Sequence, residues 1–87
     1  MSNIIITAGS VTRAISISKK INSYSQNSAT VIHTPSEINT GGCSYSVKTS
    51  SKNINLVKKL SSDNLIKYKK IYIESIIDGE SVLREIS

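Results

Sequence analysis

The sequence predicts a single α+β domain with the ferredoxin-like order β-α-β-β-α-β: an antiparallel sheet, two helices on one face, and an extra C-terminal strand. Three observations predict this class. The 87 residues suffice for one modest core. Short β-branched runs alternate with two stretches whose apolar residues recur at helical spacing. The pair Asp78-Gly79 is a hairpin signal, and it follows the fourth expected strand.

The first half of the chain predicts two strands and one helix. Residues 3–7, Asn-Ile-Ile-Ile-Thr, form a β-branched run that is typical of a buried strand. Ser10 is placed to cap a helix of about 14 residues that stops in the polar cluster at 25–28. The apolar stripe of this helix consists of Ala14, Ile17, Ile21 and Tyr24. Residues 29–33 form the second strand, which ends there because Pro35 lacks a backbone donor.

The second half predicts two more strands, a helix and the extra strand. Residues 34–43 are the longest irregular segment, and the alternation in 44–49 indicates a half-buried third strand. Ser50-Ser51 precede a helix at about 52–62 with the apolar stripe Leu56, Val57 and Leu60. We expect a fourth strand at 68–74 and a short fifth strand at 82–86, so that residues 1–87 form one domain.

Charge is distributed unevenly along the chain. Residues 1–73 carry a net charge of +8, and residues 74–87 carry −3. A basic face attracts acidic partners or nucleic acid. However, Lys outnumbers Arg nine to two, whereas Arg is the residue that specific phosphate contacts favour. We therefore favour a solvated lysine-rich surface as the explanation of the charge.

Several function classes lack the residues that they need. The longest apolar run, residues 4–6, is far shorter than the roughly 20 residues that cross a bilayer, and the N-terminus lacks a signal-peptide pattern. We therefore expect a cytoplasmic location. One His, one Cys and few carboxylates supply neither a metal site nor a catalytic triad, and no phosphate-binding glycine motif occurs. We expect no enzyme activity, no metal and no cofactor.

The single cysteine, Cys43, follows two glycines, Gly41 and Gly42. Glycines allow a partner to approach closely, and their N–H groups can support an anion such as a thiolate. The thiolate is the reactive form of cysteine. Alternatively, Cys43 is a small buried hydrophobe at a strand start, and Gly41-Gly42 is a plain turn. From the residues alone, both interpretations stay open.

His33 and Lys48 are the auxiliary cationic candidates for this site. They lie in the strands before and after the irregular segment, and pairing of those strands would bring them near the loop. His33 at a strand end is also well explained as a structural residue with a satisfied partner.

The segment around Cys43 resembles a known family. Residues 34–47, Thr-Pro-Ser-Glu-Ile-Asn-Thr-Gly-Gly-Cys-Ser-Tyr-Ser-Val, resemble the core of the selenium/sulfur carrier-like family, small bacterial proteins long grouped as a domain of unknown function. The flanking strands and helices match as well, so the resemblance covers about residues 3–74. The chain departs from the family pattern at Ser36 and Ser44, where members often carry Arg and Gly.

The resemblance implies a carrier, with Cys43 holding sulfur or selenium as a persulfide or perselenide. It implies a donor enzyme, such as a cysteine desulfurase, and an acceptor protein that the sequence does not identify. Neither the choice between sulfur and selenium nor the oligomeric state follows from the sequence.

Two other classes compete with the carrier. The split β-α-β-β-α-β order also serves RNA recognition, which uses aromatic side chains on the middle strands to stack bases. Only Tyr45 and Tyr72 are candidates for stacking, and no RNA-recognition signature run occurs, so we do not expect nucleic acid as the partner. A protein-interaction module that associates through sheet edges or faces is the other alternative.

Overall fold

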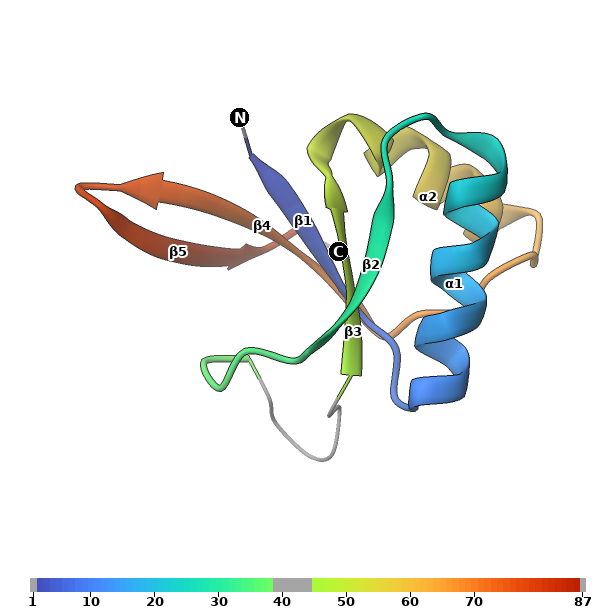
Figure 1. The fold of residues 1–87 in the computed structure, drawn as a ribbon, viewed down its shortest axis with the longest axis horizontal. Helices are drawn as coiled ribbons and strands as arrows, with labels where there is room; N and C mark the ends of the chain where they lie inside the picture. Colours follow the sequence, from blue (N-terminus) through green and yellow to red (C-terminus); the bar gives the residue numbers. More distant parts are fainter. Residues whose placement is uncertain (1, 39–44, 87) are drawn as a thin grey trace.

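The structure, a computed structural model, describes residues 2–38 and 45–86. Within these residues it has two α-helices, a short 3-10 helix and five strands (Figure 1). In chain order these are β1 (Asn3–Thr7), α1 (Val11–Tyr24), β2 (Ala29–His33), β3 (Tyr45–Ser50), η1 (Ser51–Asn53), α2 (Ile54–Ser62), β4 (Lys70–Ile77) and β5 (Glu80–Glu85). No helix in this part of the chain is long and apolar enough to cross a membrane.

The five strands form one sheet in the order β2-β3-β1-β4-β5, and every neighbouring pair is antiparallel. Each β-α-β unit is therefore split by a strand of opposite direction. β3 lies between β1 and β2, and β1 lies between β3 and β4. The predicted α+β class, the antiparallel sheet and the extra C-terminal strand are confirmed.

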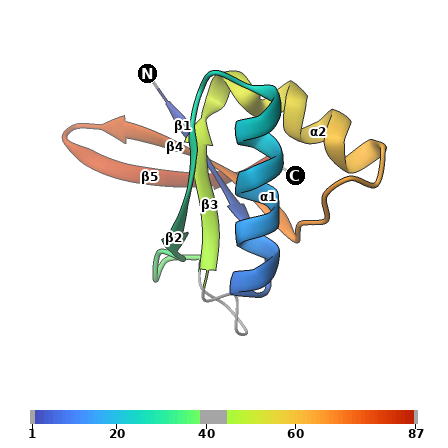
Figure 2. The same cartoon turned by 45° about the vertical axis from the view of Figure 1, so that its right-hand side comes forward.

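Both helices cover the same side of the sheet (Figures 1 and 2). Ile4 and Ile6 of β1 point toward the helices and belong to one buried cluster with residues of α1 and α2. The helical members of this cluster are Ala14, Ile17, Ile21, Val57 and Leu60. We call the other side of the sheet the open face. It carries Asn3, Ile5 and Thr7 of β1, Ser46 and Lys48 of β3, and Tyr72 and Glu74 of β4.

Helix α1 begins as predicted, because the Ser10 hydroxyl accepts a hydrogen bond from the Arg13 N–H at 3.1 Å. The prediction that Tyr24 belongs to the apolar stripe is wrong. Tyr24 is the last helical residue and is 60% exposed. Ser18 completes the buried face instead, and its hydroxyl donates to the Ala29 carbonyl at 2.8 Å. A polar residue fits there because it closes the contact between α1 and β2.

The second helical region starts in two steps. Ser50 caps η1 by accepting from the Lys52 N–H at 3.2 Å, and α2 follows directly. Asn53, at the junction, is 4% exposed and its amide makes three hydrogen bonds. These join it to the Asn27 carbonyl and the hydroxyls of Ser25 and Thr49, at 2.6–3.0 Å. This network ties the end of α1 to the end of β3.

Strand β4 begins two residues and ends three residues later than predicted, and β5 begins two residues and ends one residue earlier. Lys69 still belongs to the connection, where its N–H donates to the Thr7 carbonyl at 2.8 Å, and β4 begins at Lys70. Asp78 and Gly79 both have positive φ, 51° and 79°. They form the two-residue turn that matches the strand twist, so Ile77 pairs with Glu80 and the hairpin is longer than the hydrophobic pattern indicated.

Candidate functional site

The candidate site is the segment between β2 and β3, and its central residues lie outside the described part of the chain. Cys43, Gly41 and Gly42 all fall within 39–44. The structure does describe both ends of this segment, at 34–38 and from Tyr45 onward. The base of the site can therefore be built residue by residue.

A buried pair of hydroxyls joins the two ends of the segment. Thr34 follows β2 and Ser46 is the second residue of β3, and their hydroxyl oxygens lie 2.6 Å apart. Thr34 is 7% exposed and Ser46 is fully buried. Each hydroxyl is satisfied by the other in a place that water does not reach. A hydrogen bond between its two ends thus holds the base of the segment.

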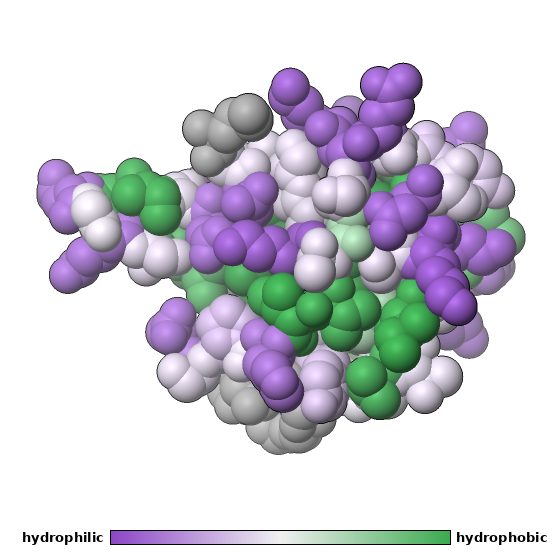
Figure 3. Space-filling model, in the orientation of Figure 1, coloured by the Kyte–Doolittle hydropathy of each residue, from purple (hydrophilic) through white to green (hydrophobic). Residues whose placement is uncertain are grey.

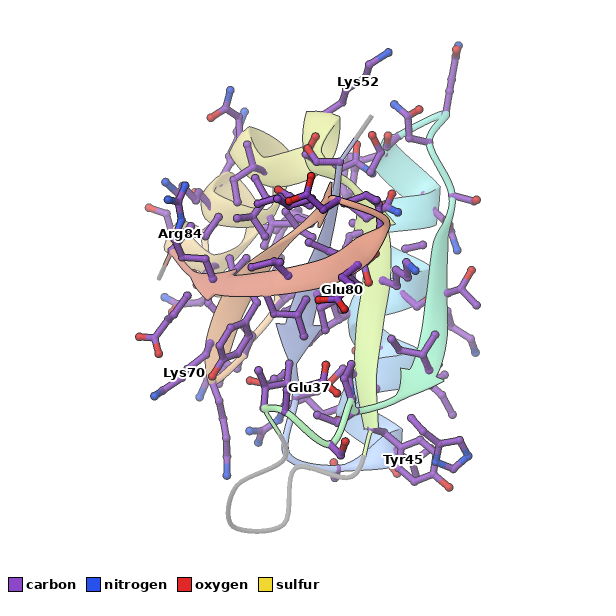
Figure 4. All side chains as sticks on the ribbon, turned by 90° about the vertical axis from the view of Figure 1, so that its left-hand side faces the viewer. Glu37, Tyr45, Lys52, Lys70, Glu80 and Arg84 are labelled. Atoms are coloured by element: carbon purple, nitrogen blue, oxygen red, sulfur yellow. The ribbon has the colours of Figure 1, made fainter. Side chains whose placement is uncertain are left out.

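The first residues of the segment fold back over the open face. The Ile38 N–H donates to the Pro35 carbonyl at 3.1 Å, which closes a turn, and the Ile38 side chain is 9% exposed. Figure 4 looks onto the open face and shows this stretch, with Glu37, crossing in front of the lower ends of the strands. Thr7 and Ser46, which lie on the open face, are buried.

His33 stands at the base of the segment, on the helix side of the sheet. It is the register partner of Tyr45, and the two rings lie 4.9 Å apart with a tilt of 35°. The Tyr45 side chain also packs against the core, whereas His33 is exposed. Pairing of β2 with β3 therefore places His33 opposite Tyr45 at the base of the segment, and the expected approach of His33 to Cys43 falls outside the described residues.

Lys48 lies on the open face, so the structure does not bring it together with His33. Its ammonium is 3.1 Å from Glu74 Oε1 on β4, and Glu74 Oε2 accepts from the Ser81 hydroxyl at 3.0 Å. Burial raises the pKa of Glu74, but the hydrogen bonds from Lys48 and Ser81 outweigh it, and the net pKa lies below the ordinary value. Lys48 is thus part of a carboxylate network that spans β3, β4 and β5.

Two further lysines lie at the other end of β1, beside Thr7, which is the register partner of Lys70. Lys69 lies against Gly9, where a Cβ would come 3.1 Å from Lys69 Cε, and Gly9 has a φ of +87°. Lys70 Nζ is 3.1 Å from Glu85 Oε1, and this hydrogen bond raises the pKa of Lys70. Sequence reasoning missed both lysines. The signal that could have found them is that β1 ends at Thr7 and β4 starts after Lys69. Antiparallel pairing of these strands places the end of β1 beside the two lysines.

The structure also bears on nucleic-acid stacking, metal binding and ligand binding. Tyr45 packs on the helix side and Tyr72 lies on the open face, so the two tyrosines do not share a stacking surface. Across residues 2–38 and 45–86, no three His, Asp or Glu side chains gather as metal ligands do. Two hollows of about 390 and 480 Å³ lie along α1, and residues 33–38 and 45–48 line neither.

The comparison with known proteins gives one match. A family model described as "putative Se/S carrier protein-like" matches residues 3–73. No curated protein and no solved structure gives a significant match. The matched region runs from β1 into β4 and includes the segment that holds Cys43. It ends before Glu74, so the second half of β4 and all of β5 lie beyond it.

Proposed function

The chain belongs to the Se/S carrier protein-like family, and from that premise we propose that Cys43 carries a single sulfur or selenium atom between two partner proteins. The observation that supports the proposal is the match over residues 3–73, because it includes the only cysteine of the chain. That cysteine comes two residues before β3, next to a glycine pair.

The transfer needs only one nucleophile. The Cys43 thiolate attacks the outer sulfur of a persulfide on the donor enzyme, a new S–S bond forms, and the donor cysteine leaves as a thiolate. An acceptor thiolate then attacks the outer sulfur of the Cys43 persulfide, and Cys43 leaves as a thiolate. The sulfane sulfur moves without net oxidation or reduction. Selenium moves in the same way as a perselenide.

The residues on either side of the segment agree with a carrier role. The hydrogen bond between Thr34 and Ser46 and the burial of Ile38 hold the two ends of the segment that contains Cys43. Gly41 and Gly42 allow a partner's backbone to come close. A cytoplasmic location agrees with this role, because a lone thiol stays reduced there.

We also infer that the fold is the ferredoxin-like one, extended by β5. The inference rests on the two split β-α-β units and on both helices lying over one face. In this arrangement the end of β2 and the start of β3 lie at the end of the sheet opposite to η1, which follows the end of β3.

Intact mass spectrometry tests the proposal. We expect incubation with a cysteine desulfurase and cysteine to add about 32 Da, one sulfur atom, to the wild-type chain. Cys43→Ala should add none. A wild-type chain that gains no mass with several desulfurases would contradict the proposal.

A paired variant separates loading from folding. Cys43→Ser should abolish loading while leaving the melting temperature almost unchanged, as expected for an accessible residue. A buried Cys43 would instead lose on the order of 1–3 kcal/mol on this change, because a polar hydroxyl would lack a partner. Gly42→Val should slow loading by crowding the approach of the donor. Its stability is measured alongside, because a positive φ at Gly42 would add strain of about 1–2 kcal/mol.

A further inference from the structure

The β4–β5 hairpin projects away from the two helices (Figure 1). Its outer part carries apolar side chains on both faces: Ile76 is 68% exposed on the open side, and Ile77 and Val82 are 54% and 43% exposed on the other. Figure 3 shows the apolar surface near the tip, bordered by hydrophilic side chains. A two-stranded ribbon with both faces in water is marginally stable. The part of the hairpin from Glu74 onward lies beyond the family match.

Strand β5 is the last strand of the sheet, and its outer edge is unpaired within the described residues. Pairing of Ile77 with Glu80 beside the turn, and the bond from the Ile86 N–H to the Ile71 carbonyl at 2.9 Å, fix the direction of the backbone groups. The backbone N–H and C=O groups of Glu80, Val82 and Arg84 point toward β4 and bond to it. The N–H and C=O groups of Ser81, Leu83 and Glu85 therefore point outward.

We propose that β5 pairs antiparallel with β5 of a second copy, about a twofold axis that passes between the two Val82 residues. A residue whose backbone groups point outward can bond only to another such residue. Ser81 therefore pairs with Leu83 of the second copy. Val82 then faces Val82, and Glu80 faces Arg84 on both sides of the axis. The two sheets become one continuous sheet.

Charge selects this register among those that the backbone allows. A shift by two residues in either direction places Ser81 or Leu83 on the axis and loses both ion pairs. A register with Glu80 opposite Glu85 would pair an inward with an outward residue and is not available. Within the described residues, neither Glu80 nor Arg84 has an ion-pair partner in its own chain. The pairing supplies a partner for both.

Packing on the helix side supports the same axis. The side chains of Glu80, Val82 and Arg84 all lie on that side. In the proposed register they form non-hydrogen-bonded pairs with the second copy, and the side chains of such pairs are the closest across two antiparallel strands. A shallow groove of about 130 Å³ runs over this surface between Ile73, Ile77 and Val82. The second copy extends the groove into an apolar strip across the interface, which covers side chains that are exposed in the single chain.

Analytical ultracentrifugation of the full chain with charge-swapped variants tests the proposal. We expect a dimer at micromolar concentrations, and we expect Glu80→Arg and Arg84→Glu each to raise the dimer dissociation constant by about tenfold or more. The double variant Glu80→Arg/Arg84→Glu restores both ion pairs, so it should return to within about threefold of the wild type.

Cysteine cross-linking tests the register itself. In a Cys43→Ala background, Val82→Cys should form a disulfide-linked dimer under mild oxidation, because facing Cα atoms are close enough. Ser81→Cys, which faces Leu83, is the matched control and should cross-link far less.

Three results would overturn the proposal. The first is a wild-type chain that remains a monomer at all concentrations, which would mean that the charges of β5 protect the edge from pairing. The second is a double swap that stays as weak as the single variants. The third is growth beyond the dimer, which would indicate pairing of β5 with the β2 edge of the next copy.

Discussion

Removal of the Ser46 hydroxyl should destabilise the domain at the base of the cysteine segment. In Ser46→Ala, the Thr34 hydroxyl, 7% exposed, loses its partner at 2.6 Å. A buried hydrogen bond contributes about 0.5–1.5 kcal/mol, and an orphaned buried hydroxyl increases the loss to about 1–3 kcal/mol. For a domain of this size, each 1 kcal/mol lowers the melting temperature by roughly 4–8 °C.

Urea unfolding of Ser46→Ala, Thr34→Val and the double variant measures this interaction as a double-mutant cycle. Each single variant leaves one unpaired hydroxyl, whereas the double variant leaves none. We therefore expect the double variant to lose less than the sum of the two, with a coupling energy of about 1 kcal/mol or more. Additive losses would refute the reasoning, because they would show that the two hydroxyls do not depend on each other.

Three further predictions follow from the same structure. Asn53→Ala removes three hydrogen bonds from a buried junction, and urea unfolding should show a loss of about 2–3 kcal/mol. Because the folded pKa of Glu74 is lowered, its contribution to stability is present above its ordinary value of 4.5 and is lost as the pH falls through the folded value; Glu74→Gln should flatten the acid limb of a melting-temperature profile from pH 7 to 3, and an unchanged limb would contradict this. Gly9→Ala adds a crowded contact with Lys69 to the strain of a positive φ, so it should lower the melting temperature more than Gly79→Ala, where the surrounding space is open.

Much of the fold could be predicted because local patterns and tertiary packing agree. Residues 3–7 and 29–33 coincide with β1 and β2, and the Ser10 cap begins α1 where the sequence indicated. The misplacement of Tyr24 and of the β4 boundaries has a tertiary cause. The hydrophobic periodicity of a helix does not indicate where the end of that helix leaves the core. The start of β4 is set by pairing with Thr7, on a strand about 60 residues earlier in the chain.

The site could be predicted only at the level of its segment. A lone cysteine after two glycines, between two strands, identified the region, and the family match covers it. The hydroxyl pair that holds its base could not be predicted, because Thr34 and Ser46 are unremarkable residues until β2 and β3 pair. The same holds for Lys48, whose carboxylate partner Glu74 lies on a strand that is not its neighbour.

The most direct test of the carrier is an intact-mass time course of loading and discharge. The chain is loaded by a cysteine desulfurase, separated from it, and mixed with a thiol acceptor. The account predicts a gain of about 32 Da that maps to Cys43 and is lost to the acceptor, after which the chain regains its original mass and loads again. A chain that never gains sulfur, gains it at another residue, or keeps it in the presence of thiol acceptors would contradict the account.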